Sequence, residues 1–151
     1  MKQQKVIDYE HFASLESMPA EDRSLIEAAA EATRSSHAPY SHFRVGVAAR
    51  LQSGAIITAA NCESEVFPSG MCAERSLLYY HASNHTGDNI VALAIASDPT
   101  ERECYPCGAC RQALLDAERR QQSPVRVIMA GGDTATVVES AETLLPFTFK
   151  L

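Results

Sequence analysis

The apolar positions of this chain recur with two different periods, and the period separates expected helices from expected strands. An apolar stripe at helical spacing predicts a first helix that begins near Ser17 and has Pro19 in its first turn. The members of this stripe are Leu25, Ile26, Ala29 and Ala32. Two further helices are expected over residues 72–82 and 109–120, because each of these segments follows a loop marked by proline and glycine.

Strand patterns separate these helices. Some segments alternate apolar and polar residues, and others are short continuous apolar runs, which are typical of strands buried on both faces. The five expected strands cover residues 43–51, 55–59, 90–96, 125–130 and 134–138. The first two form a hairpin around Gln52-Ser53-Gly54, and strands alternate with helices after it. We therefore expect an α/β protein: one domain over residues 1–151, a three-layer α/β/α fold with a mixed five-stranded sheet.

The charge balance argues against a nucleic-acid partner. Thirteen Lys and Arg residues stand against nineteen Asp and Glu residues, which gives a formal net charge of −6. Such a chain has no basic field that would hold a phosphate backbone. A composition with 46% hydrophobic and 21% charged residues is that of a folded globular protein.

Neither a membrane partner nor a leader is expected. The longest regular apolar run, residues 90–96, is far shorter than the ~20 residues of a membrane-spanning helix. The first twelve residues show no apolar stretch and no cleavage site of a signal peptide. We therefore expect a cytoplasmic protein, in which five cysteines serve thiol or metal chemistry and not disulfides.

Three cysteines are candidates for one metal site. Cys72 opens one expected helix, and the pair Cys107 and Cys110 opens the other. Helices that follow the carboxyl ends of strands begin at the same edge of a sheet, where ligands bind in α/β proteins. Three thiolates leave one position of a tetrahedral zinc open for water, as in catalytic sites. By spacing alone, Cys104 could instead pair with Cys107, or the thiols could bind a structural zinc or stay free.

Two side chains next to Cys72 complete this hypothesis. Glu74 lies in the first turn of the same helix, where its carboxylate can reach a water on the metal without being a ligand. Arg75 is a candidate to hydrogen-bond the thiolates and to offset their charge, although it could also be an ordinary surface residue. Cys62 is expected to be a small buried space-filling residue.

Two motifs of this chain resemble those of a known protein family. The runs Cys72-Ala73-Glu74-Arg75 and Pro106-Cys107-Gly108-Ala109-Cys110-Arg111-Gln112 resemble the two signatures of the cytidine deaminases, a pattern already known for zinc deaminases in a form with His in place of Cys72. The likeness includes residues 38–48, 61–63 and 144–146, in the same order. It is greatest for the short, homotetrameric branch that uses three cysteines and acts on free nucleosides.

The resemblance implies a role for each matched residue. Cys72, Cys107 and Cys110 would bind one Zn²⁺ per subunit, and Glu74 would protonate ring N3 and carry a proton to the leaving ammonia. Asn61 and Glu63 would hydrogen-bond the ribose hydroxyls, while Phe43 and Ala73 would line the nucleoside pocket. Phe149 would stack on the base in a neighbouring subunit's site. These last assignments compete with plainer interpretations: Glu63 as a loop acid, and Phe43 and Phe149 as packing residues.

The expected reaction is therefore zinc-dependent hydrolytic deamination of cytidine and 2′-deoxycytidine to the uridines, a step of pyrimidine salvage. Two positions depart from the family pattern, because Ser64 replaces an Asn and Phe67 replaces a Tyr that enters an adjacent site. A related cytosine nucleoside such as blasticidin S is an alternative substrate. From another class, the chain could be a non-catalytic zinc-binding interaction protein, for which Glu74 would have no use.

Overall fold

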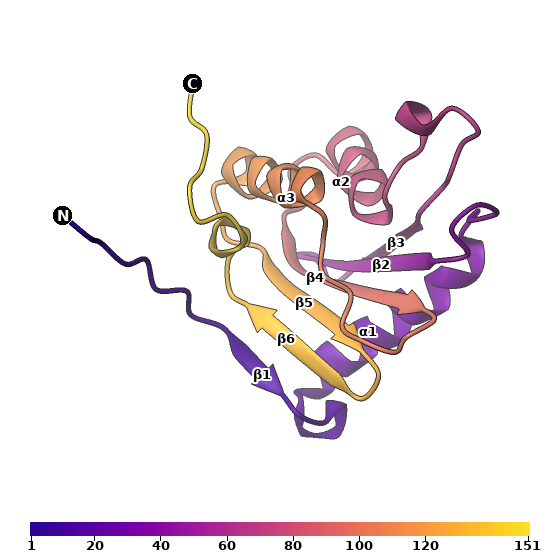
Figure 1. Cartoon of the computed structure of the whole chain (residues 1–151), viewed down its shortest axis with the longest axis horizontal. Helices are drawn as coiled ribbons and strands as arrows, with labels where there is room; N and C mark the ends of the chain where they lie inside the picture. Colours follow the sequence, from indigo (N-terminus) through magenta and orange to yellow (C-terminus); the bar gives the residue numbers. More distant parts are fainter.

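A mixed β-sheet of six strands, in the order β1-β6-β5-β4-β2-β3, runs through the computed structural model, which describes all 151 residues (Figure 1). Only β4 and β5 pair in parallel, and every other neighbouring pair is antiparallel. The strands are β1 (Glu10–Phe12), β2 (Arg44–Leu51), β3 (Ile56–Ala60), β4 (Ile90–Asp98), β5 (Arg126–Gly131) and β6 (Thr134–Val138).

Three α-helices cover the two faces of this sheet, which confirms the predicted three-layer α/β/α fold. Helix α1 (Ala20–Ala32) lies on one face, and α2 (Ala73–Asn84) and α3 (Gly108–Gln121) lie side by side on the other (Figure 1). Two apolar cores result, one between the sheet and α1 and a larger one between the sheet and the α2–α3 layer. None of the helices is long and apolar enough to span a bilayer.

The sheet has one strand more than the five predicted. The additional strand, β1, pairs with β6 at the edge of the sheet over three residues only. Its sequence, Glu10-His11-Phe12, is mostly exposed and too short to show an alternating pattern. A strand of this kind is defined by its hydrogen-bonded neighbour, so its own residues give little sign of it.

The first helix begins later than predicted. A 3-10 turn occupies Leu15–Ser17, and α1 starts only at Ala20. Pro19 is the residue before the first helical turn, with extended backbone angles (φ −52°, ψ 142°), and is not inside that turn. Because proline disfavours the helical conformation in the residue before it, Met18 is extended and the two helical segments stay separate.

The cysteines of the candidate metal site lie at one edge of the sheet. Strands β3 and β4 both pair antiparallel with β2, so they point the same way, and α2 follows β3 while α3 follows β4. The two helix starts therefore meet at the same edge, although β2 lies between the strands that lead to them. Cys72 and Cys107 are the residues that precede the first turns of α2 and α3.

On the opposite face, Gly46 of β2 lets α1 approach the sheet closely. A Cβ atom at this position would lie 2.1 Å from the carbonyl oxygen of Ala29. Only glycine fits at such a distance, so any side chain would push α1 away from β2. This contact fixes the strand that runs between β3 and β4 beneath the site.

Candidate active site

Three thiols form a compact cluster where α2 and α3 begin. The sulfur of Cys107 lies 3.3 Å from that of Cys110 and 3.9 Å from that of Cys72, and all three sulfurs lie within 4.8 Å of one another. Tetrahedral zinc with bonds of about 2.3 Å places sulfur ligands roughly 3.8 Å apart. The cluster therefore fits one Zn²⁺ ion, as the sequence predicted.

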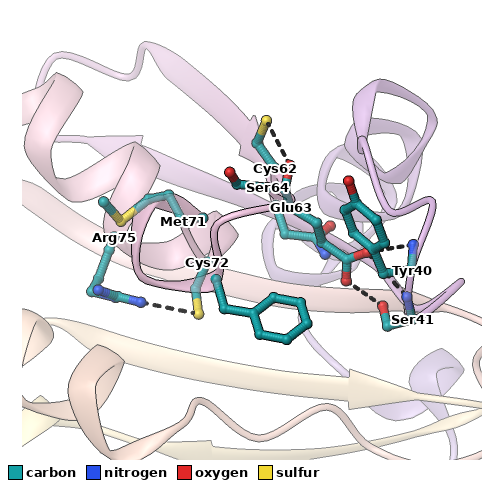
Figure 2. Close-up of a pocket in the computed structure, with 11 residues that line it drawn as sticks. Tyr40, Ser41, Cys62, Glu63, Ser64, Met71, Cys72 and Arg75 are labelled. Atoms are coloured by element: carbon teal, nitrogen blue, oxygen red, sulfur yellow. Dashed lines mark hydrogen bonds between the residues drawn. The ribbon is translucent and has the colours of Figure 1, made fainter.

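The electrostatic surroundings favour charged sulfur at this place. A hydrogen bond from the Cys110 thiol, supported by the Arg75 guanidinium against the effect of burial, lowers the pKa of Cys72 to about 5. The same interaction with Cys72, together with burial, raises the pKa of Cys110. Arg75 Nη2 donates to the Cys72 sulfur at 3.4 Å (Figure 2). Free backbone N–H groups at the starts of both helices add positive potential.

The other two cysteines lie outside the cluster. Cys104 is 8% exposed and is not part of the group of thiols, so the alternative in which it pairs with Cys107 as a ligand is wrong. Burial raises the pKa of Cys104 to about 11, so it remains a neutral thiol at pH 7. Cys62 is exposed, and the expectation that it fills buried space is also wrong.

Glu74 is placed for proton transfer beside the thiols. Its side chain is nearly enclosed, with only 4% of the residue exposed, in the first turn of α2. Burial, with a contribution from the neighbouring Cys72 thiolate, raises the pKa of Glu74 above its ordinary value. A carboxyl group with a raised pKa takes up and releases protons closer to neutral pH, as a general acid and base must.

A pocket of about 290 Å³ joins these groups to the predicted nucleoside-binding residues. Its lining comprises Ser41, Phe43, Val45, Asn61, Glu63, Cys72, Ala73, Glu74, Cys104, Tyr105 and Cys107. We call it the catalytic pocket. A larger hollow of about 510 Å³ adjoins it, shares Ser41, Asn61, Glu63 and Cys72 with it, and extends to Tyr40, Phe67 and Arg75 (Figure 2).

Glu63 holds a loop at the pocket rim. One carboxylate oxygen accepts hydrogen bonds from the backbone N–H groups of Tyr40 (3.0 Å) and Ser41 (3.1 Å), and the other accepts from the Ser41 hydroxyl (Figure 2). Donation from the Ser41 side chain is the largest of several causes that lower the pKa of Glu63. The residue is therefore a carboxylate at neutral pH, with both oxygens turned toward the loop that carries Ser41.

Asn61 connects three segments around the pocket. Its side-chain oxygen accepts from the backbone N–H of Val45 at 2.8 Å and from the Ser36 hydroxyl, and its Nδ2 donates to the carbonyl of Phe43 at 3.0 Å. One N–H of the amide is left for a ligand. Asn61 thus fixes the start of β2 as well as lining the pocket.

The structure brings together all the predicted site residues except one. Phe43 is half-buried against the pocket and Ala73 is fully buried in its wall. Phe149 is 70% exposed, and its carbonyl accepts from Arg119 near the end of α3. The thiols lie at the other end of α3. At 1.5 Å per residue, the helix separates Cys107 from Arg119 by roughly 18 Å. Phe149 therefore does not line the pocket of its own chain.

Four residues that line the catalytic pocket were not predicted as site residues: Ser41, Val45, Cys104 and Tyr105. Ser41 clamps Glu63, and Tyr105 borders the pocket beside Cys104. Tyr105 could have been found from its place just before Pro106-Cys107, since residues next to a metal ligand border the metal site. Nothing in the sequence near Ser41 indicates a partner more than twenty residues away, so that contact carries no local signal.

Comparison with known proteins agrees with this site. Residues 19–123 match the family model described as the cytidine and deoxycytidylate deaminase zinc-binding region. A probable cytidine deaminase of Dictyostelium discoideum is 34% identical over 124 residues, which are 82% of this chain and 80% of that protein. A cytidine deaminase of Halalkalibacterium halodurans is 39% identical over 92 residues, covering 61% of this chain and 68% of that protein.

Solved structures extend the likeness to the fold. The crystal structure of cytidine deaminase from Burkholderia pseudomallei superposes with a TM-score of 0.74 at 32% identity, covering 87% of this chain and all of that one (100%). Cytidine deaminase from Mycobacterium tuberculosis gives a TM-score of 0.69 at 26% identity, with 88% and 100% covered. The chain therefore belongs to the protein family that is defined by the cytidine and deoxycytidylate deaminase zinc-binding region.

Proposed function

We propose that this protein catalyses the zinc-dependent hydrolytic deamination of cytidine and 2′-deoxycytidine to uridine and 2′-deoxyuridine, with release of ammonia. The observation that carries the proposal is the enclosed Glu74 carboxylate beside three thiols spaced for one zinc. A purely structural zinc site has no use for such an acid. The similarity to proteins named cytidine deaminase supports the same reaction.

The chain's residues divide the chemistry among them. Cys72, Cys107 and Cys110 would hold the zinc ion, which would supply a Lewis acid that lowers the pKa of the attacking water. Glu74 accepts a proton from the attacking water and gives it to ring N3, and it then carries a second proton to the departing amine. Water adds at C4 and ammonia leaves, so the cytosine becomes a uracil.

Charge balance at the thiols matters for this step. Three thiolates and Zn²⁺ sum to one negative charge, which weakens the electrophile. Arg75, which donates to the Cys72 sulfur, and the starts of α2 and α3 offset part of that excess. We assign Arg75 to charge balance and not to substrate binding.

The other end of the catalytic pocket fits the sugar. We assign Asn61 and Glu63 to the ribose hydroxyls, with the free amide N–H of Asn61 as donor and the Glu63 carboxylate as acceptor. Phe43 and Ala73 enclose the base between the two ends. The small side chain of Ala73 leaves space for the base beside Glu74.

The charges around the pocket favour a free nucleoside over a nucleotide or a polynucleotide. Arg75 is the one Lys or Arg residue among those that line the catalytic pocket and the adjoining hollow, and it is bonded to Cys72. No Lys or Arg residue lines the catalytic pocket, where Glu63 is a carboxylate, so a 5′-phosphate would find no cationic partner among the lining residues. The net charge of −6 adds no attraction for a phosphate backbone. Deoxycytidylate and a single-stranded oligonucleotide are therefore expected to be poor substrates.

We further propose a homotetramer with active sites shared between subunits. Phe149 lies exposed at the far end of α3, so a base could meet it only in a neighbouring molecule. The buried Nε of Arg75, which borders the open 510 Å³ hollow, has no hydrogen-bond partner within the chain. A neighbouring subunit would supply both the aromatic ring and the missing acceptor. Ser64 and Phe67 border the same hollow. Their effect on substrate choice therefore depends on which residues of the neighbouring subunit fill that hollow.

We propose a cytoplasmic enzyme of pyrimidine salvage. A site that needs three reduced thiols is favoured where disulfides do not form, as in the cytosol. Free nucleosides released by nucleic-acid turnover would be its substrates, and the uridines its products. Fractionation of cells that produce the protein, with activity measured in each fraction, tests this placement.

The test of the reaction is loss of cytidine absorbance together with ammonia release, on protein of measured zinc content. We expect uridine and ammonia in equal amounts, loss of activity on zinc removal, and recovery on adding Zn²⁺. Blasticidin S assayed in parallel tests the alternative substrate. A zinc-loaded protein that releases no ammonia from any cytosine nucleoside would favour the non-catalytic zinc-binding alternative.

A further inference from the structure

Tyr105 borders three neighbouring hollows. It lines the catalytic pocket of about 290 Å³, a second hollow of about 500 Å³ that reaches Arg102 and Thr134, and a third of about 650 Å³ that reaches Tyr9 and His11. The catalytic pocket is the smallest of the three and is at the lower end of the usual range for ligand sites. Tyr105 thus forms part of the partition that keeps it small.

The tyrosine is held in place although it is 55% exposed. Its hydroxyl donates to Glu103 Oε2 at 2.8 Å. The Glu103 side chain is 7% exposed, its other oxygen accepts from the Thr134 hydroxyl at 2.7 Å, and His11 Nδ1 lies 3.5 Å from it. Burial alone would raise the pKa of Glu103, but hydroxyl hydrogen bonds outweigh it and lower that pKa. Glu103 is therefore a fixed, charged acceptor for the phenol.

The backbone beneath this pair is docked on the end of β5. Cys104 N–H donates to the Ala130 carbonyl at 3.1 Å. A Cβ atom on Gly131 would lie 2.0 Å from the Arg102 carbonyl oxygen, so only glycine permits this approach. The loop from Arg102 to Tyr105 therefore has little freedom to move away from the pocket.

Along the chain, Tyr105 is close to the metal end of the pocket and not to the segment that carries the proposed sugar contacts. It lies two residues before Cys107, one of the thiols of the metal cluster, whereas Asn61 and Glu63 belong to the segment that follows β3. Deamination requires C4 of the base to lie at the metal and Glu74. On the proposed function, the ring edge that carries C4 and its neighbour C5 therefore lies toward the metal cluster, and Cys104 and Tyr105 line the same pocket as Cys107.

We propose that Tyr105 is a specificity-determining residue that limits the size of the C5 substituent on the cytosine ring, and that Glu103 is the positioning residue that holds it. This inference rests on the proposed function. Shortening Tyr105 would open the catalytic pocket toward the two larger hollows. Cytosine nucleosides with bulky C5 groups would then fit better relative to cytidine itself.

The experiment compares kcat/KM for cytidine, 5-methylcytidine and 5-iodocytidine in wild type, Tyr105→Ala and Tyr105→Phe, with zinc content measured for each. We expect the kcat/KM for 5-iodocytidine, divided by that for cytidine, to rise about 10-fold or more in Tyr105→Ala. This is the scale of the effect of one misfitting methylene in an apolar pocket. Tyr105→Phe keeps the ring but loses its hydrogen bond to Glu103, so a smaller rise of about 2–10-fold is expected. Tyr9→Ala widens only the outer hollow and should leave the ratio unchanged.

Calorimetric binding of uridine and 5-iodouridine to the same proteins gives a second readout that does not need turnover. If the wild-type protein does not convert cytidine, the proposed function is wrong. The ratio of the dissociation constants for 5-iodouridine and uridine still tests whether Tyr105 limits the size of the C5 substituent. If Tyr105→Ala does not fold, Tyr105→Leu also shortens the wall and takes its place. Equal ratios in wild type and the shortened variants, in turnover and in binding, would overturn the assignment of Tyr105.

Discussion

At one end of the catalytic pocket, the thiols of Cys72, Cys107 and Cys110 lie on the starts of two helices, whereas at the other end Asn61 and Glu63 lie on a loop after β3. The helical end is preorganised by backbone geometry, because Cys107 and Cys110 are one turn apart and close on each other without help. The loop end is held by side-chain hydrogen bonds to segments sixteen to twenty-five residues away. Changes at the first end should abolish chemistry, and changes at the second should loosen binding.

The largest effect is expected from removing a metal ligand. Cys72→Ala, Cys107→Ala and Cys110→Ala should each lose bound zinc and with it the measurable deamination of cytidine, since two sulfurs cannot complete the site. Zinc per subunit, measured by metal analysis, checks this. Cys104→Ser is the matched control and should keep its zinc. Equal zinc loss in Cys104→Ser would mean that the ligand set is wrong.

The loop end is tested by Glu63→Gln. The Gln amide cannot accept from all the donors that now face the carboxylate, so both the loop at Ser41 and the proposed ribose contact weaken. We expect kcat/KM for cytidine to fall roughly 10–150-fold, the scale of hydrogen bonds to a charged group, mainly through KM. Steady-state kinetics with zinc analysis measure it. A fall in zinc content to match the fall in activity would contradict the separation of the two ends.

The sharing of sites between subunits is tested by Phe149→Ala. Stacking of an aromatic ring on a base is worth about 1–3 kcal/mol, so kcat/KM should fall roughly 5–150-fold with zinc unchanged. Mixing this variant with Glu74→Gln subunits provides a sharper check. Mixed tetramers should regain activity, because some sites combine an intact Glu74 with a neighbour's intact Phe149. A fully active monomer in sedimentation would exclude the shared site.

The smallest effect concerns Cys104. With its pKa raised from 9.0 to about 11, its thiolate fraction at pH 8 is on the order of 100-fold lower than for an unperturbed thiol. Alkylation of Cys104 in the folded zinc enzyme should therefore be slow at pH 8 and accelerate as the pH approaches 11. Peptide mapping after timed iodoacetamide treatment measures the rate, with the unfolded protein as control. Rapid alkylation at pH 8 would contradict the buried, neutral thiol.

The same contrast explains what could be predicted from the sequence. The pairs Cys72–Glu74 and Cys107–Cys110 follow from fixed spacing at two helix starts, and the expected topology with the family resemblance brought the three thiols and Glu74 together as one site. The Glu63–Ser41 clamp and the Glu103–Tyr105 pair depend on how loops dock, which no local pattern encodes. Strand β1 was missed for a related reason, since its three residues are ordered by pairing with β6. The predicted start of α1 was too early because Pro19 precedes the first helical turn and does not lie within it.

The most direct measurement is the turnover of cytidine by wild type and Glu74→Gln, with zinc determined on the same samples. Glu74→Gln removes the proton carrier and leaves all three sulfurs in place, so it should fold and hold zinc as wild type does. Its kcat should fall on the order of 10²–10⁴-fold, the contribution of a general acid and base. A Glu74→Gln protein that holds zinc and still converts cytidine within a few-fold of the wild-type rate would contradict the assignment of this site as a deaminase centre.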